Sequence, residues 1–287
     1  MANVEVEPPA AIMKQGTLNA VPGEMKIVGI LNVTTDSFFD GGRYSQTPIA
    51  IEKGLSLAAE GADLVDIGAE STSIYGEKIT AAQEIERLTP VIEALRKEGI
   101  RISVDTYKPE VMQHVISLGA EMINDVSGLK DEAAIKVVRD AGLPVVIMFN
   151  RNPDIHAQTT LRDHTTVMSE VVAFFTERLK TIHDAGIADE KVIIDPGMGL
   201  FVGGTESSLV ILRHLETLKQ FGREIYLSAS RKSFIGTVLD RPVEARGYGT
   251  LAVEIWAYLH GVDYIRTHEP GPLRDAVRMI QAIEQVE

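Results

Sequence analysis

A short basic segment, residues 230–236 with the sequence SRKSFIG, directly follows the apolar run 225–227. A lysine and an arginine at the exit of a strand can hold an anionic or electron-rich substrate, and Ser233 is placed to act as the N-cap of the next segment. Taken alone the motif is weak, because Lys and Arg are mostly exposed and a solvated surface loop would look the same. Its meaning depends on the rest of the chain.

Polar side chains also end other apolar runs. Asp105 and Asp195 each close a run rich in Ile and Val, and Asn124 closes a third. An unpaired buried charge is costly, so both carboxylates need partners, which the N–H donors of a ligand would supply. Asn124 carries both a donor and an acceptor. The three side chains together could therefore recognise the edge of a flat heterocycle.

Residues suited to an anion end the first and last runs. Asn32 closes the first run, and Arg266 and His268 close the last; positive charge and donors of this kind suit phosphate oxygens. Other polar residues at the run ends are Asp36, Asp66, Glu70, Ser71, Thr72, Thr106, Asp125, Asn150 and Arg151. Any single one is explained equally well as a cap or turn residue, but the whole set is not. One site would hold a heterocycle beside a polyphosphate leaving group.

The elements that must position these residues repeat along the chain. Eight apolar runs occupy residues 26–33, 63–69, 101–106, 122–126, 144–150, 192–196, 224–228 and 264–268, and stretches with helical spacing such as 82–97, 131–141, 163–184 and 247–260 lie between them. This alternation predicts a (β/α)8 TIM barrel, with the active site at the carboxyl ends of its strands. An open, doubly wound sheet is the alternative, but the chain has neither GxGxxG after the first run nor GxxxxGK[ST].

Length and composition agree with one α/β domain. The 287 residues are 45% hydrophobic and 24% charged, which is typical of globular proteins. We expect residues 1–24 to form a weakly ordered leader and residues 25–287 the barrel. No apolar run reaches the length of a membrane span, and the first residues lack the pattern of a secretory signal, so a cytoplasmic protein without membrane contact is expected.

Charge and cysteine content exclude several classes of protein. The formal net charge of −13, without a cluster of Lys and Arg, argues against a nucleic-acid partner. The absence of cysteine excludes disulfides, thiolate metal sites and a cysteine nucleophile. A substrate anion would need a local basic site assembled from scattered residues.

Seven segments resemble, in order, the dihydropteroate synthases of the pterin-binding barrel family. They are residues 29–38 (GILNVTTDSF), 66–72 (DIGAEST), 103–106 (SVDT), 123–126 (INDV), 195–199 (DPGMG), 230–234 (SRKSF) and 266–268 (RTH). The resemblance covers residues 25–285. It implies condensation of 6-hydroxymethyl-7,8-dihydropterin diphosphate with 4-aminobenzoate, which gives 7,8-dihydropteroate and diphosphate with the assistance of Mg2+.

The resemblance also implies roles for individual residues. The pterin would be bound by Asp105, Asn124, Asp195 and Lys232, and the diphosphate by Asn32, Thr72, Arg266 and His268, with Asn32 near the metal and Ser233 near the carboxylate of 4-aminobenzoate. Asp105, Lys232 and Arg266 are the expected catalytic residues. The seven histidines form no HExxH motif, so the metal is expected to arrive with the diphosphate. A homodimer through helices of the C-terminal half is also implied.

Two loops depart from the family pattern. Residues 72–76 read TSIYG where the family usually has Thr-Arg-Pro-Gly, and residues 199–203 read GLFVG where it usually has Gly-Phe-Gly-Lys. In addition, Thr35 replaces a usual proline, and residues 148–150 replace a strand end that usually contains His. Both loops are expected to border the 4-aminobenzoate site. The departures resemble the sulfonamide-insensitive synthases carried on mobile elements, so sulfonamides are expected to compete poorly.

Two alternative functions remain at the level of sequence. A pterin-dependent methyltransferase acting on a corrinoid partner would share Asp105, Asn124 and Asp195, but it would not need residues 230–233 or the anion site of Arg266 and His268. A pterin-binding barrel without catalysis is the second alternative, and the altered loops are the feature that suggests it.

Overall fold

The computed structural model describes residues 25–33, 46–71, 76, 78–152, 155–156, 158–160 and 162–286. Eight parallel strands form one sheet, in the order β6-β5-β4-β3-β2-β1-β8-β7. The strands are β1 (Lys26–Asn32), β2 (Leu64–Gly68), β3 (Ile102–Asp105), β4 (Met122–Asp125), β5 (Val145–Met148), β6 (Val192–Asp195), β7 (Tyr226–Leu227) and β8 (Tyr264–Thr267). A parallel bridge between Ile194 of β6 and Ile225, the residue before β7, closes the barrel.

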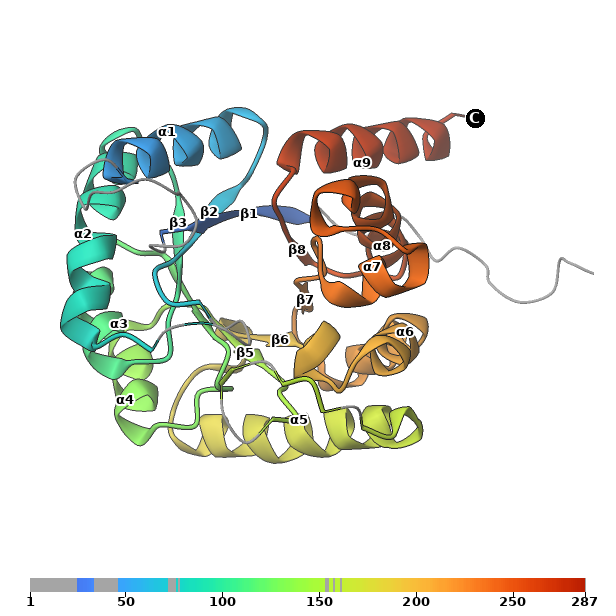
Figure 1. Cartoon of the computed structure of the whole chain (residues 1–287). Helices are drawn as coiled ribbons and strands as arrows, with labels where there is room; N and C mark the ends of the chain where they lie inside the picture. The colour runs from blue at the N-terminus through green and yellow to red at the C-terminus, as the bar shows by residue number, and fades with distance from the viewer. Residues whose placement is uncertain are drawn as a thin grey trace, which may run out of the picture.

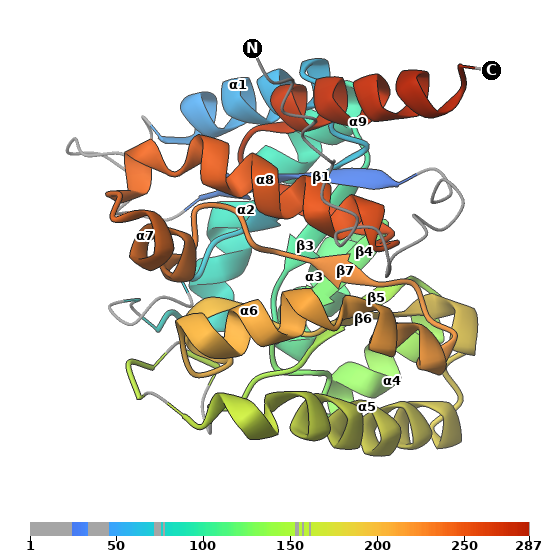
Figure 2. The same cartoon turned by 90° about the vertical axis from the view of Figure 1, so that its right-hand side faces the viewer.

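Helices surround the closed sheet on its outer side (Figure 1). They are α1 (Gln46–Ala59), α2 (Ala81–Lys97), α3 (Pro109–Ser117), α4 (Glu132–Ala141), α5 (Val167–Asp184), α6 (Thr205–Arg213), α7 (Ser233–Leu239), α8 (Gly247–Leu259) and α9 (Pro270–Glu284). Short 3-10 turns lie between them, among them η2 (His164–Thr166), η4 (Gly199–Phe201) and η5 (Leu215–Phe221). Figure 2 shows α7, α8 and α9 together on one side of the barrel.

Local sequence signals explain where several helices begin and end. Thr80 and Gln83 form a reciprocal capping box at the start of α2. The side chain of Asp131 accepts hydrogen bonds from the first backbone N–H groups of α4, and Gly142 ends that helix in the left-handed conformation. These caps satisfy backbone groups that would otherwise lack hydrogen-bond partners at the helix ends.

The predicted barrel is confirmed, and each predicted apolar run contains a strand. The strands are shorter than the runs, most of all β7, which has two residues. The expected N-cap role of Ser233 is wrong: Lys232 occupies the cap position of α7 without a side-chain cap bond, and Ser233 is the first helical residue. The predicted leader, residues 1–24, lies outside the described residues.

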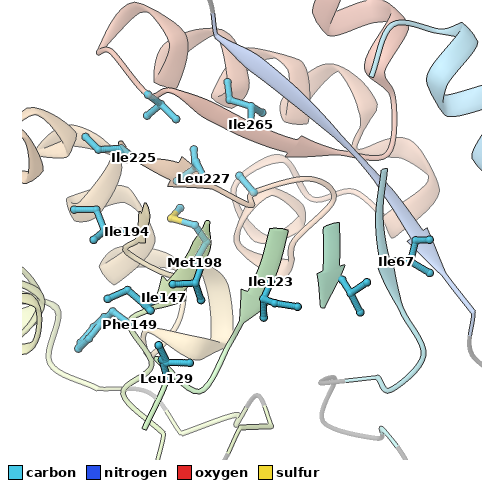
Figure 3. Close-up of a cluster of buried hydrophobic side chains, with 14 of the residues drawn as sticks. Ile67, Ile123, Leu129, Ile147, Phe149, Ile194, Met198, Ile225, Leu227 and Ile265 are labelled. Carbon is cyan, nitrogen blue, oxygen red and sulfur yellow. The ribbon is translucent and has the colours of Figure 1, made fainter. Parts of the chain in front are cut away.

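Alternating side chains of the strands build two apolar layers. One set packs outward against the helices, and Figure 3 shows part of it, including Ile67, Ile123 and Ile265. The other set fills the barrel interior with Val28, Leu64, Met122, Val146, Ile193, Tyr226 and Tyr264. Successive residues of a strand point to opposite faces, so both layers follow from the same apolar runs. The interior layer forms the floor beneath the strand ends.

No helix in the described part of the chain is both long and apolar enough to span a membrane.

Candidate active site

A polar layer lies directly above the apolar floor of the barrel. Two residues after the interior positions Leu64, Met122, Ile193 and Tyr264, the strands carry Asp66, Asn124, Asp195 and Arg266. A step of two residues keeps a side chain on the same face of a strand, so these four polar side chains also face the interior. The barrel interior is therefore apolar in one layer of side chains and charged in the next. The charged layer lies at the carboxyl ends of the strands, where (β/α)8 enzymes bind their substrates.

Arg266 holds two carboxylates of this layer together. Its Nε donates to Asp66 Oδ2 at 2.6 Å, and its second terminal nitrogen lies 3.2 Å from Asp105 Oδ2. Asp66 also accepts from Ser103 Oγ at 2.6 Å and from Asn124 Nδ2 at 3.1 Å. Hydrogen bonds from donors on three strands thus converge on one carboxylate, which fixes the positions of Arg266 and Asn124.

Asp66 belongs to this centre although the predicted site residues do not include it. Its side chain is fully buried, and its role is to hold Arg266 and Asn124 rather than to face the mouth. The signal was present in the sequence, because a carboxylate in the middle of the apolar run LVDIG must find partners inside the fold. Asp125, by contrast, accepts from the backbone N–H groups of Ser127 and Leu129 and stabilises the turn after β4.

Burial shifts the pKa values of Asp105, Asp195 and Lys232. It raises the pKa of Asp105 to about 7, although the Arg266 guanidinium acts in the opposite direction. It raises the pKa of Asp195 to about 6 and lowers the pKa of Lys232 to about 8, and the attraction between these two charges opposes both shifts. A carboxyl group with a pKa near neutral changes its protonation state easily when a ligand binds. The N–H donors of a ligand would favour the ionised carboxylate forms of Asp105 and Asp195.

The basic segment after β7 is tied to the end of β8. Ser230 Oγ lies 2.9 Å from His268 Nδ1, and it accepts a hydrogen bond from the backbone N–H of His268 at 3.2 Å. Burial and the charge of Arg266 lower the pKa of His268 to about 4, so the imidazole is neutral at pH 7. His268 therefore offers hydrogen bonding to an anion, while the positive charge comes from Arg266 and Lys232.

The loop after β6 contains the altered residues 199–203. It is held by hydrogen bonds from Arg151 and Asn152, which follow the neighbouring strand β5. The backbone N–H of Arg151 donates to the Phe201 carbonyl at 2.9 Å, and its side chain donates to the Val202 carbonyl at 3.1 Å. Asn152 donates to the Leu200 carbonyl at 3.3 Å. The ring of Phe201 lies 5.3 Å from Lys232 Nζ, within the range of a cation–π contact. The altered loop and the basic segment thus meet at the same place.

Of the remaining predicted site residues, the structure describes Asn32 and Ser233. Asn32 ends β1 with an exposed side chain, and Ser233 Oγ lies close to Gly199 across the mouth. Thr72, Asp36 and the altered residues 73–75 lie outside the described residues. Near the β2 exit, Lys108 forms ion pairs with Glu70 and Glu84, an arrangement that the sequence did not indicate.

The described residues contain no group of three or more His, Asp or Glu side chains arranged to hold a metal ion. Asn32 can still supply an amide oxygen at the mouth, and Mg2+ is commonly held by few protein ligands together with substrate phosphates. The side chains present therefore fit a metal that is bound mainly through the diphosphate.

Comparisons with known proteins agree in both sequence and structure. Residues 28–268 match the pterin binding enzyme family. The chain is 38% identical over 260 residues to the Escherichia coli dihydropteroate synthase type-3, covering 90% of this chain and 99% of that protein, and 37% identical over 261 residues to the type-2 enzyme of the same organism, covering 90% and 96%. A structure of Xanthomonas albilineans dihydropteroate synthase with 4-aminobenzoic acid has a TM-score of 0.86 at 37% identity, covering 92% of this chain and 95% of that one. A complex of the same organism's enzyme with 7,8-dihydropteroate has a TM-score of 0.82 at 37% identity, covering 94% and 96%.

Proposed function

Because the chain belongs to the pterin-binding enzyme family and carries out the reaction of its dihydropteroate synthases, we propose that the polar layer of its barrel binds 6-hydroxymethyl-7,8-dihydropterin diphosphate. The observation that carries this assignment is the set of Asp105, Asn124, Asp195 and Arg266 above an apolar floor. The second substrate, 4-aminobenzoate, enters from the mouth between the loops after β2 and β6.

The polar layer matches the chemistry of a pterin. Asp195 and Asp105 supply acceptors for its amino and ring N–H groups, and Asn124 supplies both a donor and an acceptor. Lys232 completes the recognition of the heterocycle on the side that faces Phe201. Asp66 stays below the substrate and keeps Arg266 and Asn124 in place.

The reaction replaces a carbon–oxygen bond by a carbon–nitrogen bond. The bond from the pterin methylene to the diphosphate breaks, and its electron pair leaves with the diphosphate. Asp105 stabilises the cation that is delocalised into the pterin ring, while Arg266 and His268 stabilise the departing anion. The amine of 4-aminobenzoate attacks the methylene carbon and then releases a proton to water. Positioning of this amine matters more than its deprotonation.

Mg2+, held by Asn32 and the substrate phosphates, would neutralise charge on the leaving diphosphate. We place Thr72 with Asn32, Arg266 and His268 in the diphosphate site, and Ser233 near the carboxylate of 4-aminobenzoate.

The experiment that tests this function is an assay of diphosphate release with purified protein, the pterin diphosphate and 4-aminobenzoate. Release is expected only with both substrates, and chelation of Mg2+ by EDTA should suppress it reversibly. Pterin binding without diphosphate release would support a non-catalytic barrel instead. Release that continues in EDTA would contradict the metal assignment alone.

We also propose that the altered loops reduce the affinity for sulfonamides while keeping that for 4-aminobenzoate. The loop after β6 supports this idea, because the clamp from Arg151 fixes Phe201 against Lys232. If Phe201 is held rigidly, a sulfonamide larger than 4-aminobenzoate would be excluded by a steric clash with it, and not by the loss of a favourable contact.

A strain that lacks its own folate synthase provides the test for this proposal. The gene is expected to restore growth, and growth should persist at sulfonamide concentrations that stop a strain complemented by a drug-sensitive synthase. A pocket difference of about 3 kcal/mol would separate the two inhibition constants by roughly 100-fold. Equal sensitivity of the two strains would refute the proposal without affecting the reaction itself.

A homodimer through the C-terminal helices is the third proposal. Exposed apolar side chains gather on α7, α8, α9 and the segment after α7, and α8 contacts both of its neighbours. They are Val238, Leu239, Val243, Tyr248, Trp256, Met279 and Ile283. Tyr248 is 93% exposed, which is unusual for a large aromatic side chain in a monomer. A second copy of the chain would cover this face.

Light scattering of the purified protein is expected to give about twice the chain mass of 31.3 kDa. Tyr248→Glu should shift the mass toward one chain, because a charge in an apolar interface is costly. Ile49→Glu is a matched control, since Ile49 is 43% exposed but lies on α1. A single-chain mass for the unaltered protein would overturn the proposal.

A further inference from the structure

The turn that carries Lys232 contains an unfavourable backbone conformation. The N–H of Lys232 donates to the Ala229 carbonyl at 3.2 Å, which closes a four-residue turn. Arg231, the third residue of this turn, has a φ of 56°, in the left-handed region. Glycine or asparagine is preferred at such a position, and a longer side chain is strained there. Strain of this kind persists only where the surroundings enforce it, and it is common at functional sites.

The strand before the turn is too short to enforce it. β7 contains only Tyr226 and Leu227. The contact between Ser230 and His268 fixes the start of the turn, but it leaves the peptide groups of Arg231 undetermined. The constraint on Arg231 must therefore come from another element.

Helix α8 supplies that constraint through its first turn. Thr250 Oγ1 accepts a hydrogen bond from the backbone N–H of Arg231 at 3.0 Å. The Arg246 guanidinium donates to the backbone carbonyl of Arg231 at 2.9 Å and also to the Arg241 carbonyl at 3.2 Å. Thr250 is 1% exposed, so its hydroxyl has no access to water in place of this contact. Both backbone polar groups of Arg231 are thus bound at the start of α8, by Arg246 at the N-cap position and by Thr250 in the first turn.

Helix α7 leaves room for the Arg246 side chain at Gly236. A Cβ atom on Gly236 would lie 2.3–2.4 Å from three atoms of the Arg246 guanidinium group. Gly236 does not have the positive φ that would itself call for glycine. The glycine of the segment SRKSFIG is therefore explained by the need to admit Arg246, and α7 loses some intrinsic helix stability as a result.

We propose that Arg246 and Thr250 are positioning residues for Lys232: they hold Arg231 in its left-handed conformation, and this conformation directs Lys232 toward Asp195 and Phe201. The inference rests on the proposed role of Lys232 in pterin binding. Neither Arg246 nor Thr250 touches the polar layer of the barrel, so they act only through the turn.

Calorimetric titration with the pterin diphosphate tests the proposal on the full-length protein. Thr250→Val keeps the shape of the side chain but removes the acceptor, and it is expected to weaken binding about tenfold, the effect of one buried hydrogen bond. Thr250→Ser retains the hydroxyl and should bind within about threefold of the unaltered protein. Gly236→Ala should also weaken binding, about threefold or more, although alanine favours the helix itself.

A double-mutant cycle separates positioning from a general structural effect. If Thr250 acts through Lys232, Thr250→Val should cause no further loss of binding in a Lys232→Ala background, to within about twofold. Additive losses would overturn the proposal, as would unchanged binding by Thr250→Val. If Lys232→Ala itself binds the pterin diphosphate normally, the proposed role of Lys232 in the pterin site is wrong. That result is distinguishable from additive losses and from unchanged binding by Thr250→Val. Thermal unfolding of each variant identifies any that do not fold, and Gly236→Ala then supplies an independent readout.

Discussion

Replacing Lys232 by alanine is expected to lower kcat/KM for the condensation by at least about 100-fold, the usual effect of removing a positioned polar group from a buried site. Lys232 is the cation whose charge most strongly opposes the raised pKa of Asp195, and its ammonium group faces the ring of Phe201. Its loss would remove the proposed pterin contact beside the second substrate and leave Asp195 without that charge. Steady-state assays of diphosphate release, with each substrate varied in turn, give the separate effects on kcat and KM.

Lys180→Ala is a suitable control for this substitution. Lys180 lies on α5 with a side chain that is 74% exposed, far along the chain from any strand exit, and its replacement should leave the kinetics unaltered. If Lys232→Ala behaves in the same way as this control, Lys232 contributes nothing to substrate binding or turnover, and its proposed contact with the pterin is wrong.

Replacing Arg266 by methionine is expected to impair both stability and turnover. Asp66 is fully buried and accepts the 2.6 Å hydrogen bond from Arg266, while Asp105 lies 3.2 Å from the same guanidinium. Removing one partner from a buried ion pair typically costs about 3–5 kcal/mol, because the remaining charge is uncompensated. Urea unfolding measures this loss, and the same preparations should show little diphosphate release, because the leaving anion has lost its cation.

A second substitution divides these two effects. Adding Asp66→Asn to Arg266→Met removes the more deeply buried of the two carboxylate charges that Arg266 compensates, so it should restore part of the stability without restoring turnover. Arg101→Met, at a side chain that is 54% exposed, serves as the surface control. Full activity in the double variant would show that Arg266 acts only on the fold, and it would remove Arg266 from the proposed anion site.

The barrel could be predicted because its signal is local. Each run of Val, Ile and Leu contains a strand, and alternation within the run builds the outer core and the floor of the barrel together. The expected positions of Asp105, Asn124 and Asp195 at strand ends agree with the structure for the same reason. Strand lengths were less predictable: β7 has only two residues, and the chain turns between Ala229 and Lys232 before α7 begins.

Pairing between distant residues could not be predicted. Asp66 and Arg266 are 200 positions apart in the chain, and they meet only because β1 lies between β2 and β8 in the closed sheet. For this reason Asp66 was missed as the centre of the polar layer. Ser233 was misplaced as an N-cap because the start of α7 follows a turn whose backbone groups are bound by Arg246 and Thr250, which lie outside the segment.

The basic segment at residues 230–236 illustrates the same division. The sequence by itself determined that it follows a strand and that it carries Lys232 and Ser233, and it predicted that its neighbours at other strand ends suit a flat heterocycle and a polyphosphate. Only the tertiary structure decided how Lys232 is directed, because a left-handed Arg231 is unfavourable in isolation; its carbonyl accepts a hydrogen bond from Arg246, and its N–H donates one to Thr250. Local patterns specify which elements form and which face each residue takes, whereas the direction of a side chain such as Lys232 depends on contacts that exist only after the elements have packed.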